Sequence, residues 1–455
     1  MCKKLFFIPH LFNIRLFKLW TCLKGAGFIL LFFNLVLNCC LAASPIPIEP
    51  IKKDDRILIL APHPDDEAIG CAGIIQQALL VGAQVEVVYL TNGDHNQVAF
   101  IVYEKRLTLK KGEFIHMGKV RRAEAIKAMK LLGLNEDNLI FLGYPDFGTF
   151  TIFSRYWQTK KPFGSLLTRI SSVPYKENLS YGAPYVGESI LNDLKKVLLD
   201  YKPNKIFVSH PADVNVDHKS FYLFLQVALR DLNKEIPHPK VYPYLIHCVG
   251  WPIPRHYHPK LSLEPPRQFQ DAQINWLEFS LTPEQLNKKY RAILCYKSQT
   301  QSSAFYLLSF ARRNELFGDY PEIGLKKHGL ENLIEDKGQV SYALMDNSIL
   351  IRIEQSKKLN RRFSLMLYLF GYSYKTPFAS MPKIRIITRH NKFKVFDGRL
   401  MIKPSGISLQ LDSHVLILKV PLQILGDPDF ILTSVRAYGR PLPAGVIGFR
   451  KIDIK

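Results

Sequence analysis

Cysteine is scarce in this 455-residue chain, and several familiar sequence signatures are missing. Four of the seven cysteines precede residue 45, which leaves Cys71, Cys248 and Cys295, an odd set without a pairing framework. No zinc-finger spacing, aromatic RNA-binding signature or concentrated basic block occurs, so we expect no nucleic-acid partner despite the formal charge of +22. The basic excess favours anionic surroundings such as a membrane surface or acidic glycans, or it is simply a diffusely charged surface.

Formal charge is absent between Lys24 and Glu49. Residues 25–43 of this gap are mostly apolar and nearly long enough to span a bilayer, which needs about 20 residues. Basic residues precede the gap, and Leu41-Ala42-Ala43 before Ser44 resembles a cleavage site. Residues 1–45 are therefore predicted to be a signal peptide or an N-terminal membrane anchor. We expect an exported protein that is periplasmic, in the cell envelope or membrane-anchored.

Strand and helix patterns alternate from residue 57 to residue 229. This alternation predicts an α/β fold with a Rossmann-like, mainly parallel sheet and helices on both faces. The predicted strands are 57–60, 85–90, 139–142 and 205–209. The predicted helices are 66–81, 120–132, 188–199 and 218–229. Residues 236–270 are proline-rich and are expected to be irregular, and Thr282 with Gln285 predicts a capped helix start.

From about residue 345 the apolar pattern changes to a period of two. Asp397-Gly398 reads as a hairpin turn, and about eight short strands predict a smaller antiparallel β-sandwich. The predicted division is 1–45, then an α/β domain over 46–335, then a sandwich over 345–455 that is a candidate for glycan binding.

Two polar clusters follow predicted buried strands. His63, Asp65 and Asp66 come directly after the first strand, and residues 210–218 follow the strand 205–209. Since functional sites gather at the carboxyl ends of parallel strands, these loops can converge on one ion. Histidine nitrogens and a carboxylate oxygen suit Zn²⁺, and three protein ligands leave a position for water. Bound zinc lowers the pKa of that water to about 7.

These clusters resemble the motifs of the PIG-L (LmbE-like) de-N-acetylase family. The first family motif, Ala-His-Pro-Asp-Asp-Glu, matches residues 62–67 with Pro62 in place of alanine. The second, His-Pro-x-Asp-x-His-Pro-Asp-His, matches residues 210–218. Weaker likenesses occur at 121–124, 143–146, 181–184, 297–299 and 313–315, so the resemblance covers about residues 54–330.

The resemblance implies a zinc hydrolase that removes the acetyl group from an N-acetylglucosamine-type sugar in a glycolipid, glycoside or polysaccharide. It makes His63, Asp66 and His218 the metal ligands, with Zn²⁺ or another divalent ion such as Fe²⁺. It makes Asp65 the general base. Asp217 is then expected to support the catalytic site, together with Asp213, by orienting histidine.

One family position differs here. Asn215 stands where the family often has a histidine that helps to stabilise the oxyanion, and Val216 replaces the usual proline. An Asn amide can donate a hydrogen bond but not a proton, so Asn215 is retained as a catalytic candidate. His247, in a strand expected over 244–249, is a second candidate, because its imidazole could take the role of the missing family histidine.

Plainer interpretations exist for several of these residues. Asp65 to Glu67 could be only a favourable acidic helix start, and Asp217 only a helix cap. Arg121 and Glu124 could form a surface pair, and Asp146 could merely shape a turn. The alternative function is a catalytically weak or inactive sugar-binding protein of the same fold. A two-metal phosphoesterase would need more ligands than these loops provide.

Overall fold

The computed structural model describes residues 45–105, 110–158, 160–269, 274–325, 334–336, 340–354, 363–389, 392–403, 405–438 and 447–454. The expected signal peptide or anchor lies outside these residues, apart from Pro45, and remains a prediction. No helix in the described part of the chain combines the length and apolarity that a bilayer span requires.

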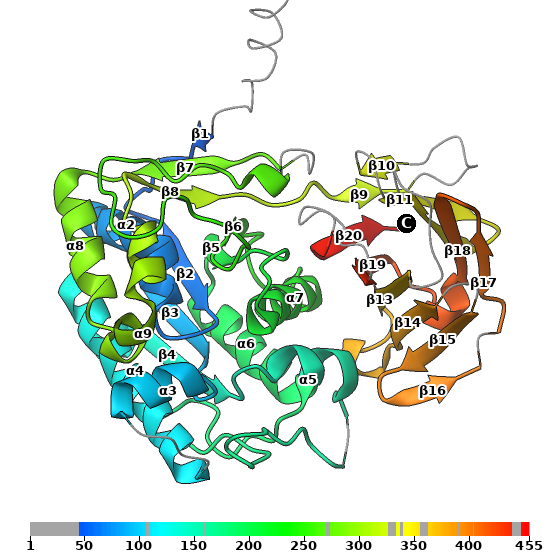
Figure 1. Cartoon of the computed structure of the whole chain (residues 1–455), viewed down its shortest axis with the longest axis horizontal. Helices are drawn as coiled ribbons and strands as arrows, with labels where there is room; N and C mark the ends of the chain where they lie inside the picture. The colour runs from blue at the N-terminus through cyan, green and yellow to red at the C-terminus, as the bar shows by residue number, and fades with distance from the viewer. Residues whose placement is uncertain are drawn as a thin grey trace, which may run out of the picture. The chain divides into compact units, whose positions relative to one another are not determined.

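An eight-stranded sheet forms the centre of the larger part of the fold (Figure 1). In spatial order it contains β1 (Ile46–Pro47), β7 (Leu277–Ser280), β8 (Asn314–Phe317), β6 (Lys240–Tyr244), β5 (Lys205–Ser209), β2 (Arg56–Ala61), β3 (Gln84–Thr91) and β4 (Leu139–Tyr144). Strands β2 to β6 run parallel, whereas β8 is antiparallel to β6 and β7. The predicted α/β class with a mainly parallel sheet is confirmed.

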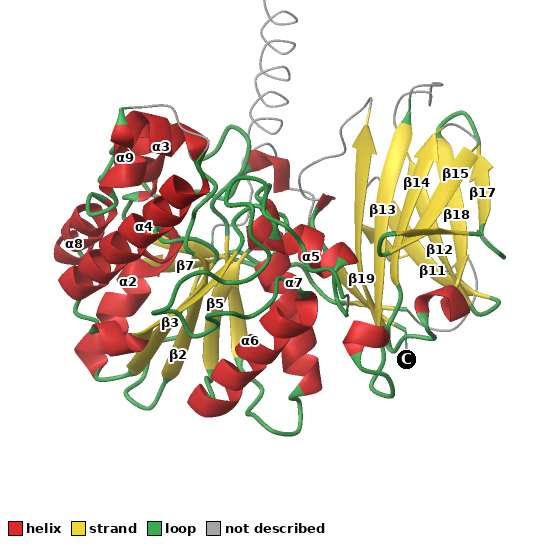
Figure 2. Ribbon diagram, turned by 90° about the horizontal axis from the view of Figure 1, so that it is seen from below, coloured by secondary structure: helices red, strands yellow, loops and turns green. Residues whose placement is uncertain are grey.

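Helices cover both faces of this sheet (Figure 2). They are α2 (Asp66–Val81), α3 (Gln97–Glu104), α4 (Lys111–Leu132), α5 (Thr149–Arg155), α6 (Gly187–Tyr201), α7 (Val216–Asp231), α8 (Pro283–Ile293) and α9 (Lys297–Leu307). Because side chains alternate across a strand, Ile57 and Ile59 of β2 join the core formed with α2, α4 and α8. Leu58 and Leu60 join the core on the opposite face, with α5, α6 and α7.

The sheet topology predicts where a site should form. The chain runs from β2 outward to β3 and β4, and then crosses to β5 and β6 on the other side of β2. Such a reversal opens a crevice at the carboxyl ends of the strands beside it. β2 and β5 are the adjacent pair at this switch point, and their following loops carry the two polar clusters.

The C-terminal part contains two further sheets. One consists of β10 (Ile334–Asp336), β11 (Val340–Met345), β12 (Ser348–Glu354), β18 (Val415–Pro421) and β17 (Ser408–Leu411). The other consists of β16 (Leu400–Ile402), β15 (Lys392–Asp397), β14 (Lys383–Arg389), β13 (Ser364–Tyr372), β19 (Phe430–Tyr438), β20 (Arg450–Asp453) and β9 (Ile323–Gly324).

Side chains from both sheets share one apolar core, for example Ile351 of β12 and Leu367 of β13. The predicted antiparallel sandwich is therefore present, with more strands than the eight expected and with one parallel pair, β9 with β20. The hairpin turn at Asp397-Gly398 lies between β15 and β16, and Gly398 adopts φ 53°, which favours glycine. The proposed domain boundaries and the glycan-binding role of residues 345–455 remain predictions.

The seven-stranded sheet also contacts the α/β core through aromatic side chains. Phe153 of α5 lies 5.3 Å from Phe370 of β13 and 5.6 Å from Phe378, measured between ring centroids. Phe153 is fully buried, so these rings belong to a continuous apolar core rather than to a surface contact.

Candidate active site

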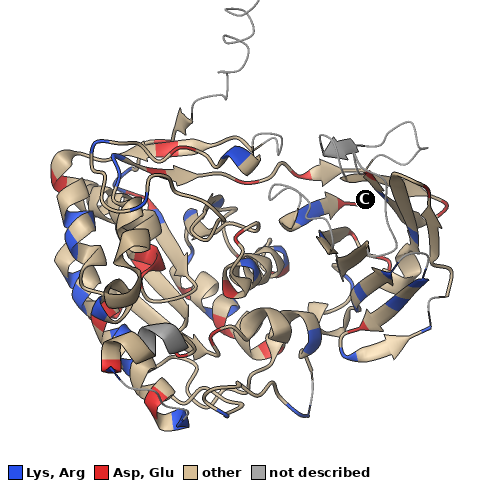
Figure 3. Ribbon diagram, in the orientation of Figure 1, with Lys and Arg blue, Asp and Glu red and all other residues tan. Residues whose placement is uncertain are grey.

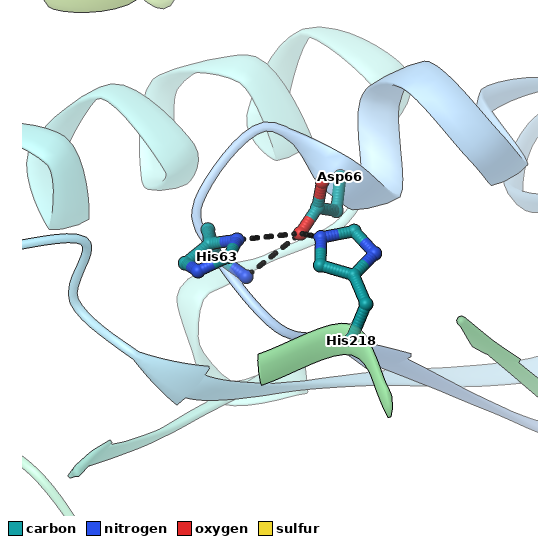
Figure 4. A group of neighbouring side chains, drawn as sticks. All are labelled: His63, Asp66 and His218. Atoms are coloured by element: carbon teal, nitrogen blue, oxygen red, sulfur yellow. Dashed lines mark hydrogen bonds and ion pairs between the residues drawn. The ribbon is translucent and has the colours of Figure 1, made fainter. Parts of the chain in front are cut away.

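Three buried side chains meet at the carboxyl ends of β2 and β5. Oδ2 of Asp66 lies 3.2 Å from Nδ1 of His63 and 3.1 Å from Nε2 of His218. Figure 4 shows the two rings on either side of this carboxylate. All three residues are buried, and their candidate ligand atoms lie within 4.8 Å of one another. The fold thus brings together the three residues predicted to bind metal, although His218 follows His63 by more than 150 positions in the chain.

Carboxylates lie behind the second ring nitrogen of each histidine. Nε2 of His63 lies 3.2 Å from Asp146 Oδ1 and 3.3 Å from Asp217 Oδ2. Nδ1 of His218 lies 3.1 Å from Asp213 Oδ2. A carboxylate in this position fixes the tautomer and the orientation of an imidazole whose other nitrogen binds a metal.

Neighbouring charges shift the pKa values of His218 and Asp66 in the direction opposite to the effect of burial. Burial lowers the pKa of His218, but Asp213 and Asp66 raise it to about 9. Burial raises the pKa of Asp66, yet the charge and hydrogen bond of His218 hold it well below its usual range. The site therefore favours ionised carboxylates and a positive charge between them, which is also the arrangement that a bound cation requires.

Asp65 occupies a strained position beside this centre. Its φ of 129° is rare for a residue with a side chain, and its carboxylate does not cap α2. Arg121 Nη2 lies 3.4 Å from Asp65 Oδ1. Burial raises the pKa of Asp65 to about 7, with Arg121 opposing the rise and Asp66 adding to it. Helix capping therefore does not account for the carboxylate of Asp65. The role of a general base near neutral pH fits its pKa and its position on the cavity wall.

Arg121 and Glu124 are not a surface pair, so that interpretation is wrong. Both are buried. Arg121 donates to the carbonyl oxygens of Pro64 at 2.8 Å and Gly93 at 3.1 Å, and so holds the loop that carries Asp65. Glu124 accepts from the backbone and the hydroxyl of Ser298 at 2.9 and 2.6 Å, at the start of α9. The helix α4 that carries them begins at Lys111, nine residues before the predicted start.

Asp217 does not cap a helix, so the plainer interpretation of this residue is wrong. The cap of α7 is Asn215, whose Oδ1 accepts from the Asp217 backbone N–H at 2.9 Å. The fully buried Asp217 carboxylate instead accepts from the backbone of Phe147 at 2.6 Å and of Thr149 at 3.1 Å, and from the Thr149 hydroxyl. Asp217 therefore ties the loop after β4 to His63.

Asp146 likewise does more than shape a turn. One of its oxygens lies by His63, and the other accepts from the His95 backbone at 3.0 Å. His95 follows β3, so Asp146 links the loops after β2, β3 and β4. Thr149 and His95 are site residues that the sequence motifs did not predict. Their places after predicted strands were the available signal, but neither stands in a metal-ligand pattern.

His247 lies at the site, although not on the predicted strand. β6 ends at Tyr244, where the strand over 244–249 was expected to begin, so that prediction is wrong. His247 is in the following loop, where Asp213 Oδ2 accepts from its backbone N–H at 2.8 Å. Its Nδ1 lies 3.2 Å from Asp213 Oδ1, and its ring centroid lies 4.6 Å from that of His218. His247 thus faces the ligand cluster across Asp213.

A cavity of about 620 Å³ opens onto these residues. Its wall contains His63, Asp65, Asp66 and Asn215, and residues from other loops and helices join them, including His95, Phe147, His247, Gln299 and Tyr306. The volume lies within the range of small-molecule sites, about 300–1,000 Å³. Two members of the His63–Asp66–His218 cluster, His63 and Asp66, therefore face this cavity.

The donor set fits a single divalent ion. Two imidazoles and one carboxylate are a common protein set for Zn²⁺ and leave a coordination position for water. Neither ring nitrogen of buried His218 has a hydrogen bond of good geometry within the described residues, although both face carboxylates. A ligand nitrogen aimed at an ion, with the other nitrogen against Asp213, accounts for this arrangement.

Residues 58–229 match the model of the PIG-L family, described as GlcNAc-PI de-N-acetylase. The match confirms the family predicted from the two motifs. No curated protein matches the chain significantly.

Solved structures give weaker likenesses. The N,N'-diacetylchitobiose deacetylase from Pyrococcus horikoshii is 18% identical, with 58% of this chain and 84% of that chain covered and a TM-score of 0.34. The zinc-inhibited form of teicoplanin deacetylase Orf2 is 16% identical, with 58% and 97% covered and a TM-score of 0.37. The 4-carboxy-2-hydroxymuconate hydratase GalB from Pseudomonas putida KT2440 is 16% identical, with 60% and 98% covered and a TM-score of 0.36.

Proposed function

We propose, from the membership of residues 58–229 in the PIG-L family, that this chain is a metal-dependent deacetylase of N-acetylated amino sugars. The observation that carries the proposal is the meeting of His63 and His218 at Asp66, with the near-neutral base Asp65 beside them. A sugar in a glycolipid, glycoside or polysaccharide is the proposed substrate class.

Zn²⁺ is the proposed ion, held by His63, Asp66 and His218, with Fe²⁺ as an alternative occupant of the same donor set. When bound, the ion would supply Lewis acidity toward the acetyl carbonyl and lower the pKa of water in the site.

Asp65 is the proposed proton carrier. It takes a proton from the attacking water, whose oxygen forms a bond to the acetyl carbon. The carbon–nitrogen bond then breaks, and Asp65 returns the proton to the departing amine, so the products are acetate and the free amino sugar. Arg121 holds this carboxylate in place through its contact with Asp65 Oδ1 and its hydrogen bond to Pro64.

Asn215 is the proposed neutral donor to the developing oxyanion. Its Oδ1 is occupied by the Asp217 N–H, which leaves the amide nitrogen as the group that can donate into the cavity. Asp217 is a positioning residue, because it contacts His63 and the backbone after β4 rather than the cavity. Export of the protein, based on residues 1–45, is also proposed and would be checked by cell fractionation.

The test is acetate release from N-acetylglucosamine and its glycosides by the purified protein. We expect activity that a chelator removes and added Zn²⁺ restores, and we expect His218→Ala to lose both bound metal and activity. The alternative sugar-binding function predicts saturable sugar binding, measured calorimetrically, without acetate release. Unchanged acetate release by a His218→Ala protein that lacks metal would refute the proposed function.

A further inference from the structure

A basic surface with no acidic partner among the described residues lies on the outer face of the seven-stranded sheet. Cross-strand register places its basic side chains together: Arg389 pairs with Lys392, Ile387 with Lys394, and Met366 with Arg436. Arg385 pairs with Phe396 one step along the same face. We call Arg385, Arg389, Lys392, Lys394 and Arg436 the basic sheet face.

Compensating carboxylates are missing from the strands that carry the basic sheet face, as far as the structure describes them. Asp397 is the one acidic residue within strands β13, β14, β15, β16 and β19. It points to the opposite side by strand alternation and accepts from the Lys383 backbone at 2.8 Å. Figure 3 shows basic segments on β14 and β15. Arg155, in the last turn of α5, adds another charge near Arg385. Burial and the charge of Arg155 both lower the pKa of Arg385, as expected for crowded cations.

Aromatic rings hold two of these guanidinium groups against the sheet. Arg385 lies 4.7 Å from the centre of the Phe396 ring, and Arg436 lies 5.4 Å from the Tyr438 ring. Arg399, at the β15–β16 turn, lies 4.9 Å from the Tyr156 ring. A guanidinium that contacts a ring through its face keeps its N–H groups available to anionic oxygens.

A large apolar side chain is exposed at the border of the basic sheet face. Met401 of β16 is 66% exposed and pairs with Phe396, so it lies on the same face as Arg385. Leu400 pairs with Asp397 and so points to the other side of the strand. A hydrated anionic polymer offers no apolar phase in which to bury Met401, whereas the boundary between headgroups and acyl chains does.

We propose that the basic sheet face, with Met401 at its edge, docks on an anionic lipid surface. The charged side chains would contact lipid phosphates while Met401 enters the acyl boundary. Farther along the same sheet face, Phe370 packs against Phe153 of the α/β core, so docking would hold the deacetylase domain close to the lipid.

The test measures cosedimentation of the full chain with vesicles of phosphatidylcholine containing increasing phosphatidylglycerol. Binding to pure phosphatidylcholine reports any contribution of residues 1–45, and the increase with anionic lipid reports the basic sheet face. The test variant is Arg389→Gln/Lys392→Gln/Lys394→Gln, at three exposed positions. At roughly 1 kcal/mol per basic residue near a membrane, we expect about 100-fold weaker partitioning onto anionic vesicles.

The matched control is Lys119→Gln/Lys127→Gln/Lys130→Gln, which removes the same charge from exposed positions of α4. We expect it to partition within threefold of the unmodified chain. Met401→Ser should weaken vesicle binding without changing binding to soluble heparin. Equal losses for both triple variants, or no dependence on phosphatidylglycerol, would overturn the proposal. So would loss of heparin binding by the test variant with vesicle binding intact, which would assign the face to an anionic polymer.

Discussion

Replacement of Asp65 by asparagine separates proton transfer from metal binding more sharply than any other single change. Asp65 is not one of the three clustered candidate ligands, and its carboxylate lies 3.4 Å from Arg121 Nη2. Asparagine keeps the size of the side chain but cannot accept a proton at pH 7. Arg121 retains its hydrogen bonds to Pro64 and Gly93, so the loop should keep its conformation.

The general-base role of Asp65 sets the expected loss of rate. Removal of a general base typically costs about 10²–10⁴ in rate, or roughly 3–5 kcal/mol of transition-state stabilisation. We therefore expect Asp65→Asn to lower kcat/KM for acetate release by that factor. Metal content, measured by mass spectrometry of the purified protein, should match that of the unmodified chain, because Asp65 is not a candidate ligand.

The control is Asp319→Asn. Burial raises the pKa of this carboxyl to about 7 as well, and it accepts from the Tyr222 hydroxyl at 2.8 Å, away from the cavity. It should lower stability without a comparable loss of rate. If Asp65→Asn hydrolyses substrate within threefold of the unmodified protein with its metal retained, Asp65 is not the base.

Three further outcomes test the surroundings of the site. Asp213→Asn removes the carboxylate 3.1 Å from His218 Nδ1 and should weaken metal affinity about 10–100-fold in a chelator competition, and unchanged affinity would contradict the orienting role. Because Asp65 must be ionised to act and its pKa is about 7, kcat/KM should rise with pH to about 7 and then level, and the residual rate of Asp65→Asn should lack this rise. Gly93→Ala would place a Cβ 2.0 Å from Arg121 Nη1 at a φ of 68°, so both rate and melting temperature should fall, whereas Gly112→Ala, with open space around it, should lower neither.

Runs of β-branched and aliphatic residues make the central strands recognisable in the sequence. The strand 205–209 and the helix 66–81 have the predicted bounds. Buried parallel strands are mostly apolar, and Ile69, Ala72, Ile75 and Leu79 recur at helical spacing in α2. The capped start at Thr282 is also confirmed, since a capping box is a local interaction between Thr282 and Gln285.

Other features depend on contacts that local sequence does not encode. α4 extends back to Lys111 although its first turns have no strong apolar period, and the strand expected over 244–249 gives way to a loop anchored on Asp213. Arg121 and Glu124 have the spacing of a surface pair, yet packing of α4 against the loop at Pro64 and the start of α9 buries both.

By itself, the sequence determined the order of strands and helices and the chemical character of the two loops, because apolar periodicity and ligand types are local properties. Only the tertiary structure decided that His63 and His218 share the Asp66 carboxylate, that Asp146 and Asp217 stand behind His63, and that Asn215 rather than Asp217 caps α7. The meeting of His63, Asp66 and His218 follows from the reversal of strand order at β2, which places loops separated by about 150 residues side by side.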